Sequence, residues 1–249
     1  MSKLENAIRN LVIANRILAH QGVVDAYGHV SMRHPDNPEH YLLSRSRSPE
    51  LVEAGDIMEF DFDGNPVGAD KRPPYLERFI HGCIYSRRPE VNAVVHSHAD
   101  DVLPFSVSLT TPLRPVVHTS GCMGAHVPVW DIRKKFGDTN LLVTNVDQGR
   151  DLAGALAANK VVLMCGHGFA AAGGSLIEAV RISVYLPKNA KVYMEALRLG
   201  EVRLLSPGEI EHKIIKNPEA PENWRAWEYW ATRAGCGDML ETPPWTRKE

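Results

Sequence analysis

The chain has 249 residues, a hydrophobic fraction of 44% and a formal net charge of −2. That length can bury a large core, whereas a charge so near neutral argues against a nucleic-acid partner, which would usually leave a basic stripe. The sequence shows no secretory signal and no run near the roughly 20 apolar residues of a membrane span, so we expect a cytoplasmic protein without a membrane partner. Its cysteines are scattered and form no C-x-x-C pair, so we expect no disulfide framework.

In the first half of the chain, the residue patterns predict helices that alternate with short strands. Apolar residues at intervals of three and four predict a helix over residues 3–20, and Gly22 would end it. Asp63-Gly64-Asn65 is a hairpin signal that would join two strands. The other elements expected here are a turn into a strand within 25–34, a strand over 41–46, one helical turn from Ser48, a helix over 75–88, a strand over 91–98 and a short helix over 100–108.

The second half continues the alternation and ends in an aromatic segment. The long helix expected over residues 175–199 would divide into two segments, because Pro187 interrupts its period. Strands and helices alternate without a repeat, which favours one α/β domain (1–205), followed by a C-terminal extension (206–249) that packs on the same domain or on a neighbouring subunit. The other elements expected are strands over 113–120, 141–145 and 160–165, a helix over 147–159 and a short helix over 226–235 whose Trp227, Tyr229 and Trp230 form a packing surface.

Two histidines end the apolar run VNAVVHSH. Residues i and i+2 of a strand point to the same side, so His96 and His98 would project together. Neutral imidazole nitrogens bind zinc and similar ions, which makes this pair a candidate set of metal ligands. Taken alone, the pair fits two partly exposed strand-end histidines equally well.

A second apolar strand ends in His167, which lies between Gly166 and Gly168. Glycines at that place let the backbone turn sharply or approach a ligand closely. Three histidines at the ends of two strands could supply three nitrogen ligands and leave open positions, as catalytic metal sites do. Glu77, in the first turn of a predicted helix, would be either an acid favoured by the helix dipole or an acid/base beside the metal, and His81, one turn later, could pair with it.

These residues carry a resemblance to a known family. The stretches YGHVSMR, SRSRSPELV, YLERFIHG, VNAVVHSHAD and MCGHGFAAAGGSLIEAV resemble, in that order and from about residue 4 to 199, the class II aldolase/adducin family. The resemblance implies one three-layer α/β/α domain around a mostly antiparallel sheet, in a homotetramer with active sites at subunit interfaces. It also implies that His96, His98 and His167 bind one divalent metal ion per subunit, zinc or manganese, and that Glu77 is the catalytic acid/base.

The chain departs from the sugar-phosphate aldolases of that family where they hold phosphate. Their G-N-V-S turn, T-P-T-G loop and Ser-Ser pair are replaced here by Gly28-His29-Val30-Ser31, Leu43-Ser44-Arg45-Ser46 and Tyr75-Leu76. Tyr75 and Leu76 are bulky and lack the small hydroxylated side chains and close backbone access that a phosphate cradle needs. Arg45 and Arg47 suit a planar carboxylate, which a guanidinium can bind through two hydrogen bonds, although a solvated loop is the alternative.

The same pattern resembles the branch of the family that decarboxylates hydroxylated aromatic carboxylates, such as a hydroxypyridine dicarboxylate or a dihydroxyphthalate. That branch implies a small-molecule substrate whose carbon–carbon bond breaks, a carbanion stabilised by the metal, and a proton donated by Glu77. An aldolase or epimerase of a sugar or hydroxyketone is the second hypothesis, and a non-catalytic adducin-like binding module is the third. The residues expected to bind substrate are His29, Ser31, Ser44, Arg45, Arg47, Tyr75 and His118.

Overall fold

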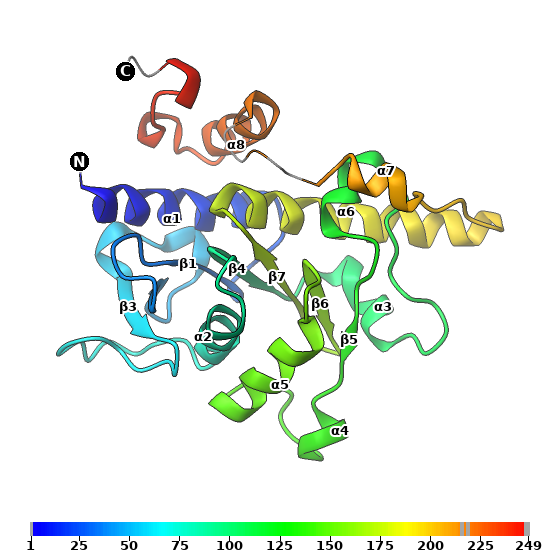
Figure 1. Cartoon of the computed structure of the whole chain (residues 1–249), viewed down its shortest axis with the longest axis horizontal. Helices are drawn as coiled ribbons and strands as arrows, with labels where there is room; N and C mark the ends of the chain where they lie inside the picture. Colours follow the sequence, from blue (N-terminus) through cyan, green and yellow to red (C-terminus); the bar gives the residue numbers. More distant parts are fainter. Residues whose placement is uncertain (1, 215–216, 218–219, 247–249) are drawn as a thin grey trace.

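A single sheet organises the computed structural model, which describes residues 2–214, 217 and 220–246. Seven strands lie in the order β3-β2-β1-β4-β7-β6-β5 (Figure 1). Every neighbouring pair is antiparallel except β5 and β6, which run parallel. The strands are β1 (His29–Arg33), β2 (His40–Ser44), β3 (Ile57–Asp61), β4 (Ala93–Ser97), β5 (Val129–Trp130), β6 (Val161–Met164) and β7 (Gly168–Gly173).

Helices and short helical turns connect these strands. The α-helices are α1 (Lys3–His20), α2 (Arg78–Arg87), α3 (Leu103–Val107), α4 (Arg133–Phe136), α5 (Val146–Leu156), α6 (Leu176–Leu199), α7 (Pro207–Glu211) and α8 (Pro221–Arg233). The 3-10 turns are η1 (Pro49–Leu51), η2 (Ala54–Asp56), η3 (Asp100–Val102), η4 (His118–Met123), η5 (Gly237–Met239) and η6 (Pro244–Thr246). No helix in this described part of the chain is long and apolar enough to cross a membrane.

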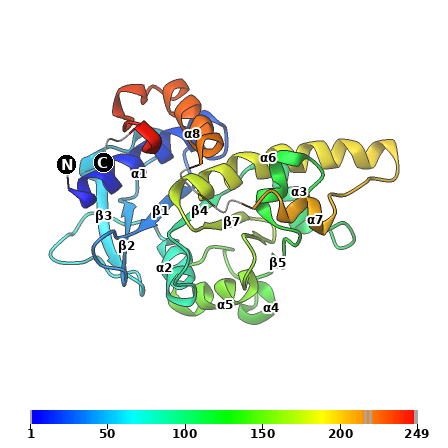
Figure 2. The same cartoon turned by 45° about the horizontal axis from the view of Figure 1, so that its top comes forward.

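The helices cover both faces of the sheet and so produce three layers. α1, α6 and α8 lie on one face, while α2 and α5 pack together on the other (Figures 1 and 2). Side chains alternate along β4, so Val95 belongs to the apolar core beneath α1 and α6 and Val94 to the core beneath α2 and α5. The α/β/α architecture with a mostly antiparallel sheet is therefore confirmed.

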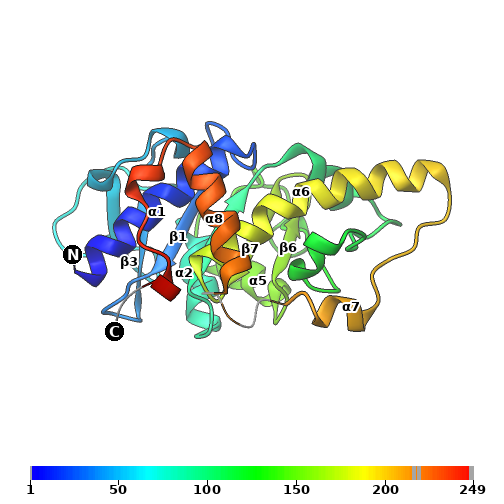
Figure 3. The same cartoon turned by 90° about the horizontal axis from the view of Figure 1, so that it is seen from above.

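The C-terminal aromatic residues pack on the same chain. α8 rests against α1 and α6 (Figure 3). Trp224, Trp227 and Trp230 are buried in the core under these helices, while Tyr229 is exposed. The division of the chain at residue 205 stays a prediction. All four cysteines are free thiols.

α6 is one continuous helix, so the prediction of two segments was wrong. Pro187 lies inside it. A proline within a helix costs about 3 kcal/mol, because it removes one hydrogen bond and crowds the preceding turn. Burial of Leu186, Asn189 and Ala190 around the proline offsets this cost and holds the helix together.

Two predicted strands do not form. Residues 113–120 lack a strand partner, because the backbone N–H groups of Val116 and Val117 donate to the Asn189 side chain at 2.8 and 3.4 Å. Residues 141–145 form a loop, in which Leu141 has a φ of +68° that no strand residue adopts. The hairpin turn after β3 is present, but its second strand is reduced to a single bridge between Phe60 and Pro66, since proline cannot donate a ladder hydrogen bond.

Candidate metal centre

Strand pairing brings the three predicted histidines together at one end of the sheet. His96 is in β4, His98 follows that strand, and His167 lies in the turn between β6 and β7. β4 pairs with β7 in the register Ser97 to Phe169, which places the two strand ends side by side. The Nε2 atom of His98 lies 3.0 Å from Nε2 of both His96 and His167.

Backbone carbonyls fix the orientation of two of these rings. His96 Nδ1 lies 3.0 Å from the Phe169 carbonyl oxygen, and His167 Nδ1 lies 2.9 Å from that of Leu141. A carbonyl oxygen only accepts, so in the neutral rings both Nδ1 atoms carry the hydrogen and both Nε2 atoms present a lone pair. Outer hydrogen bonds of this kind are typical of histidines that bind metals.

Neutral rings cannot satisfy all the hydrogen bonds among these three nitrogen atoms. Burial, and then His96 and His167, lower the pKa of His98 to about 4, so its ring is neutral at pH 7. A neutral His98 carries at most one hydrogen on Nε2 and can satisfy only one of the two lone pairs that face it. A divalent ion would remove the conflict, and the donor set of three imidazole nitrogens and a carboxylate oxygen suits such an ion.

Glu77 supplies that carboxylate. It precedes the first residue of α2, not within the first helical turn as predicted, and its side chain makes no capping hydrogen bond. Its Oε2 atom lies 3.4 Å from Nε2 of both His96 and His167, and its Oε1 atom accepts the Val143 N–H at 2.9 Å. Burial raises the pKa of Glu77, but the electrostatic influence of the neighbouring His96 and His167 outweighs burial and holds the pKa well below its usual range.

A glycine permits the close packing of the two strand ends. A Cβ atom added at Gly168 would lie 2.1 Å from the Ser97 carbonyl oxygen, whereas one added at Gly154 in α5 would meet nothing within 4 Å. We therefore expect Gly168→Ala to lower the free energy of unfolding by about 1–3 kcal/mol, as overpacking does, and to displace His167. Gly154→Ala, the matched control, should be neutral or stabilising by about 0.5–1 kcal/mol. Urea unfolding of metal-free protein at one chain concentration checks this, and equal midpoints for the two variants would contradict it.

A row of buried, hydrogen-bonded polar side chains lies beside the histidine cluster. The His29 ring packs 5.0 Å from that of His96 and 4.5 Å from that of Tyr75, measured between ring centroids. His29 Nδ1 lies 2.6 Å from His81 Nε2, and Ser31 Oγ lies 2.5 Å from His81 Nδ1 and 2.8 Å from the Tyr85 hydroxyl. His81 thus bonds to His29 and Ser31, and the expected pairing of His81 with Glu77 is not formed.

Two periodicities in the sequence could have revealed this row of hydrogen-bonded side chains. Glu77, His81 and Tyr85 recur at intervals of four, which places them on one side of α2. His29 and Ser31 are two apart in β1 and so face the same side of the sheet. Neither His81 nor Tyr85 was predicted to hydrogen-bond to His29 or Ser31 beside the histidine cluster.

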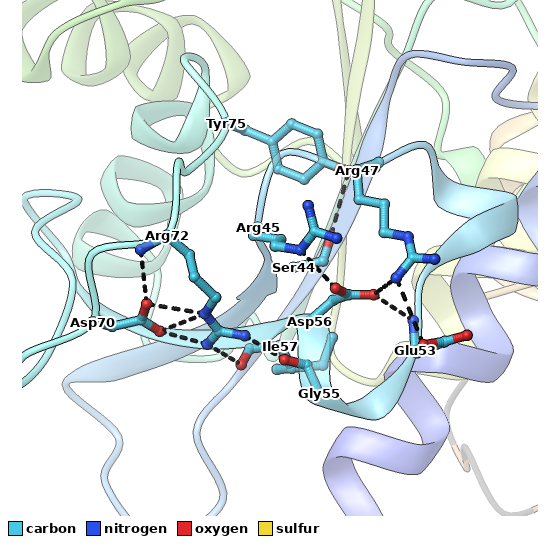
Figure 4. Close-up of polar contacts among 10 residues, drawn as sticks. All are labelled: Ser44, Arg45, Arg47, Glu53, Gly55, Asp56, Ile57, Asp70, Arg72 and Tyr75. Atoms are coloured by element: carbon cyan, nitrogen blue, oxygen red, sulfur yellow. Dashed lines mark hydrogen bonds and ion pairs between the residues drawn. The ribbon is translucent and has the colours of Figure 1, made fainter.

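Arg45 and Arg47 are held by a carboxylate that sequence reasoning missed. Arg45 Nε and Arg47 Nη1 each lie 2.6 Å from an oxygen of Asp56 (Figure 4). Burial raises the pKa of Asp56, but hydrogen bonds from Glu53 N–H and the two arginines outweigh it and lower the pKa overall. The Tyr75 hydroxyl donates to the Arg47 carbonyl oxygen, and Ser44 Oγ donates to the Tyr75 hydroxyl at 3.3 Å.

The other predicted substrate-binding residues differ in exposure. Ser31 and Ser44 are fully buried, so both would support neighbouring side chains instead of meeting substrate. His118 begins η4, is exposed, and lines a cavity with Lys213 and Tyr229 that includes none of the clustered histidines. Tyr27, which was not predicted, is 69% exposed, and its ring lies 6.4 Å from that of His98.

The three-layer α/β/α fold and the set of three histidines and one glutamate define a candidate metal-dependent enzyme. The Class II Aldolase and Adducin N-terminal domain matches residues 9–194, so the chain belongs to this family. It is 36% identical to the decarboxylase tropJ of Talaromyces stipitatus, in an alignment 254 positions long that covers 93% of this chain and 95% of that protein. It is 30% identical to 3,4-dihydroxyphthalate decarboxylase of Arthrobacter keyseri, over 76% of this chain and 78% of that protein.

A solved structure shares the fold. The aldolase II superfamily protein of Pseudomonas syringae has a TM-score of 0.78 and 20% identity to this chain, and the match covers 96% of each. The family and these relatives identify the chain as an enzyme of the lyase class.

Proposed function

We propose that this lyase is a metal-dependent decarboxylase of a hydroxylated aromatic carboxylate with a benzene or pyridine ring. The observation that carries the proposal is the convergence of His96, His98, His167 and Glu77, whose ligand atoms all lie within 4.8 Å of one another. Similarity to the two decarboxylases supports the type of reaction.

The three histidines would hold one divalent ion, zinc or manganese. When bound, the ion supplies Lewis-acid stabilisation of negative charge that develops on a substrate oxygen. His96 and His167 need no reorganisation to act as ligands, because backbone carbonyls already turn their Nε2 lone pairs inward. His98 supplies the third nitrogen.

Glu77 moves the proton of the reaction. Its carboxylate takes the proton of the ring hydroxyl beside the bond that breaks. The bond between the ring carbon and the substrate carboxylate breaks, CO2 leaves, and the electron pair stays on the ring carbon. Glu77 returns the proton to that carbon, so the products are CO2 and the phenolate, and the Val143 N–H holds the carboxylate in position throughout.

Arg45 and Arg47 would bind the substrate carboxylate. Each commits one nitrogen to Asp56, and Arg47 Nη1 also lies 3.6 Å from Glu53 Oε2, so the remaining guanidinium N–H groups would donate to the substrate. The Tyr75 ring packs on His29 and would give an aromatic substrate a flat wall. Ser44 and Ser31 would hold Tyr75 and His81 in place.

An aldolase or epimerase that acts on a sugar or hydroxyketone is the alternative, and the family name supports it. It is less well supported because bulky Tyr75 and Leu76 stand where a phosphate cradle would need small hydroxylated residues. A non-catalytic adducin-like module would have no need of four converging ligand atoms.

We also propose a homotetramer with active sites at subunit interfaces. The exposed His118 would then serve the site of a neighbouring subunit, since it is outside the histidine cluster of its own chain. Light scattering of the purified protein measures the assembly, and a monomer at all concentrations would remove this role for His118.

A CO2-release screen tests the proposed reaction. Protein loaded with zinc or manganese would be offered hydroxylated benzoates, phthalates and pyridine carboxylates, beside a panel of hydroxyketones and sugar phosphates. CO2 release from at least one hydroxyaromatic acid supports the proposal. Cleavage of a hydroxyketone without turnover of any carboxylate would reverse the ranking in favour of an aldolase.

The arginine pair makes a separate prediction. Arg45→Gln and Arg47→Gln should each raise the KM of the carboxylate found in the screen by roughly 10–100-fold, because a hydrogen bond to a charged group is lost. Arg198→Gln is the charge-matched control, since Arg198 is exposed near the end of α6 and, among the residues that the structure describes, pairs only with Glu195. An unchanged KM in both variants would show that the substrate carboxylate binds elsewhere.

A further inference from the structure

The hydrogen bonds that link Tyr85, Ser31, His81 and His29 all donate in one direction, because these side chains are buried. Tyr85 is 1% exposed, Ser31 and His81 are fully buried, and His29 is 4% exposed. Burial, and then His96, lower the pKa of His81 to about 3, so this ring is neutral at pH 7. A neutral imidazole has one hydrogen to place, as does each hydroxyl.

Only one arrangement uses every buried donor. In the part of the chain that the structure describes, the Tyr85 hydroxyl meets Ser31 Oγ and the backbone N–H of Val94, and an N–H cannot accept a hydrogen. If Ser31 donated to Tyr85, the phenol hydrogen would have no acceptor in a site closed to water, which is unfavourable. Tyr85 therefore donates to Ser31, and Ser31 in turn donates to His81 Nδ1.

The direction continues through both imidazole rings. With its Nδ1 accepting, His81 carries its hydrogen on Nε2 and donates it to His29 Nδ1 at 2.6 Å. With its own Nδ1 accepting, His29 carries its hydrogen on Nε2. That atom makes no hydrogen bond among the described residues, and the protein does not fully enclose it.

We propose that Tyr85, Ser31 and His81 hold His29 as the neutral Nε2–H tautomer, so that His29 presents a hydrogen-bond donor to an anionic oxygen of the substrate beside the metal ligands. The ring lies 5.0 Å from that of His96 and 4.5 Å from that of Tyr75, which places it between the histidine cluster and the proposed aromatic wall. A fixed neutral donor stabilises negative charge as it develops and needs no reorganisation. His29 would be a catalytic residue, while His81, Ser31 and Tyr85 are positioning residues.

The tautomer can be measured without any substrate. In ¹⁵N-histidine-labelled wild-type protein, metal-free and zinc-loaded, two-bond nitrogen–proton correlations at neutral pH report which ring nitrogen carries the hydrogen. Signals are assigned by their loss in His29→Gln and, independently, in His81→Gln. We expect His29 and His81 both to be Nε2–H, and a His29 that is mainly Nδ1–H or doubly protonated would overturn the proposal.

A matched pair of amides tests the donor in turnover, and this part rests on the proposed function. The glutamine amide nitrogen reaches the position of imidazole Nε2, whereas the asparagine amide nitrogen reaches that of Nδ1. His29→Gln should therefore retain at least about 10-fold more kcat than His29→Asn, with a smaller difference in KM. Equal kcat values would overturn a donor role for His29, while failure of the decarboxylase assay alone would leave the tautomer result standing.

Discussion

Replacing Glu77 with glutamine is expected to abolish most turnover while the metal ion stays bound. Glutamine has the same shape, and its amide oxygen can still accept the Val143 N–H that the Glu77 Oε1 atom accepts at 2.9 Å. His96, His98 and His167 remain as ligands. The amide can neither take nor return a proton at neutral pH, so kcat should fall by about 10²–10⁴-fold, the usual contribution of general acid–base catalysis.

Steady-state kinetics with the substrate found in the CO2 screen, together with metal analysis of the same sample, checks this prediction. Glu195→Gln is the control, because Glu195 is exposed in α6 and its one ion pair within the described part of the chain is with Arg198. A Glu77→Gln enzyme with wild-type kcat would refute the proton-transfer role. Loss of the ion from Glu77→Gln would instead show that the carboxylate is an indispensable ligand.

His96→Asn should lose the metal ion but keep the fold. The asparagine amide nitrogen stands close to the position of imidazole Nδ1, so it can still donate to the Phe169 carbonyl oxygen, which His96 reaches at 3.0 Å. The Nε2 ligand is removed. Because even an outer hydrogen-bond partner of a ligand contributes 10–100-fold to metal affinity, loss of a ligand itself should weaken binding by at least about 100-fold, and activity should fall with it.

His126→Asn is the matched control for this substitution, since His126 is exposed and outside the cluster. Isothermal titration with zinc measures the affinities, and circular dichroism shows whether the variant has folded. Wild-type zinc affinity in a folded His96→Asn protein would exclude His96 as a ligand. Excess zinc should restore part of the activity if the loss comes from binding alone.

Local patterns in the sequence predicted the candidate ligands but not how they meet. The alternation of one strand places His96 and His98 on the same side, and this needs no knowledge of the fold. That His167 joins them depends on the pairing of β4 with β7, between segments far apart in the chain, for which the sequence contains no local signal. The resemblance to a family of known fold supplied this step.

The failures have a common physical cause, which is that tertiary partners outweighed local preference. Val116 and Val117 favour a strand, yet their N–H groups bond to Asn189 of α6. Pro187 should break a helix, yet burial holds α6 together. Asp56 could not be predicted as the partner of Arg45 and Arg47. The residue spacing of a loop does not indicate which carboxylate will contact its side chains.

The metal content of the purified wild-type protein tests the central claim most directly. Elemental analysis after dialysis against metal-free buffer, followed by titration of chelated protein with zinc and with manganese, gives the number of ions per chain. The structure predicts one tightly bound divalent ion per chain, held by His96, His98 and His167, and loss of activity on chelation that the ion restores. A protein that binds no divalent ion and stays active after chelation would contradict the account.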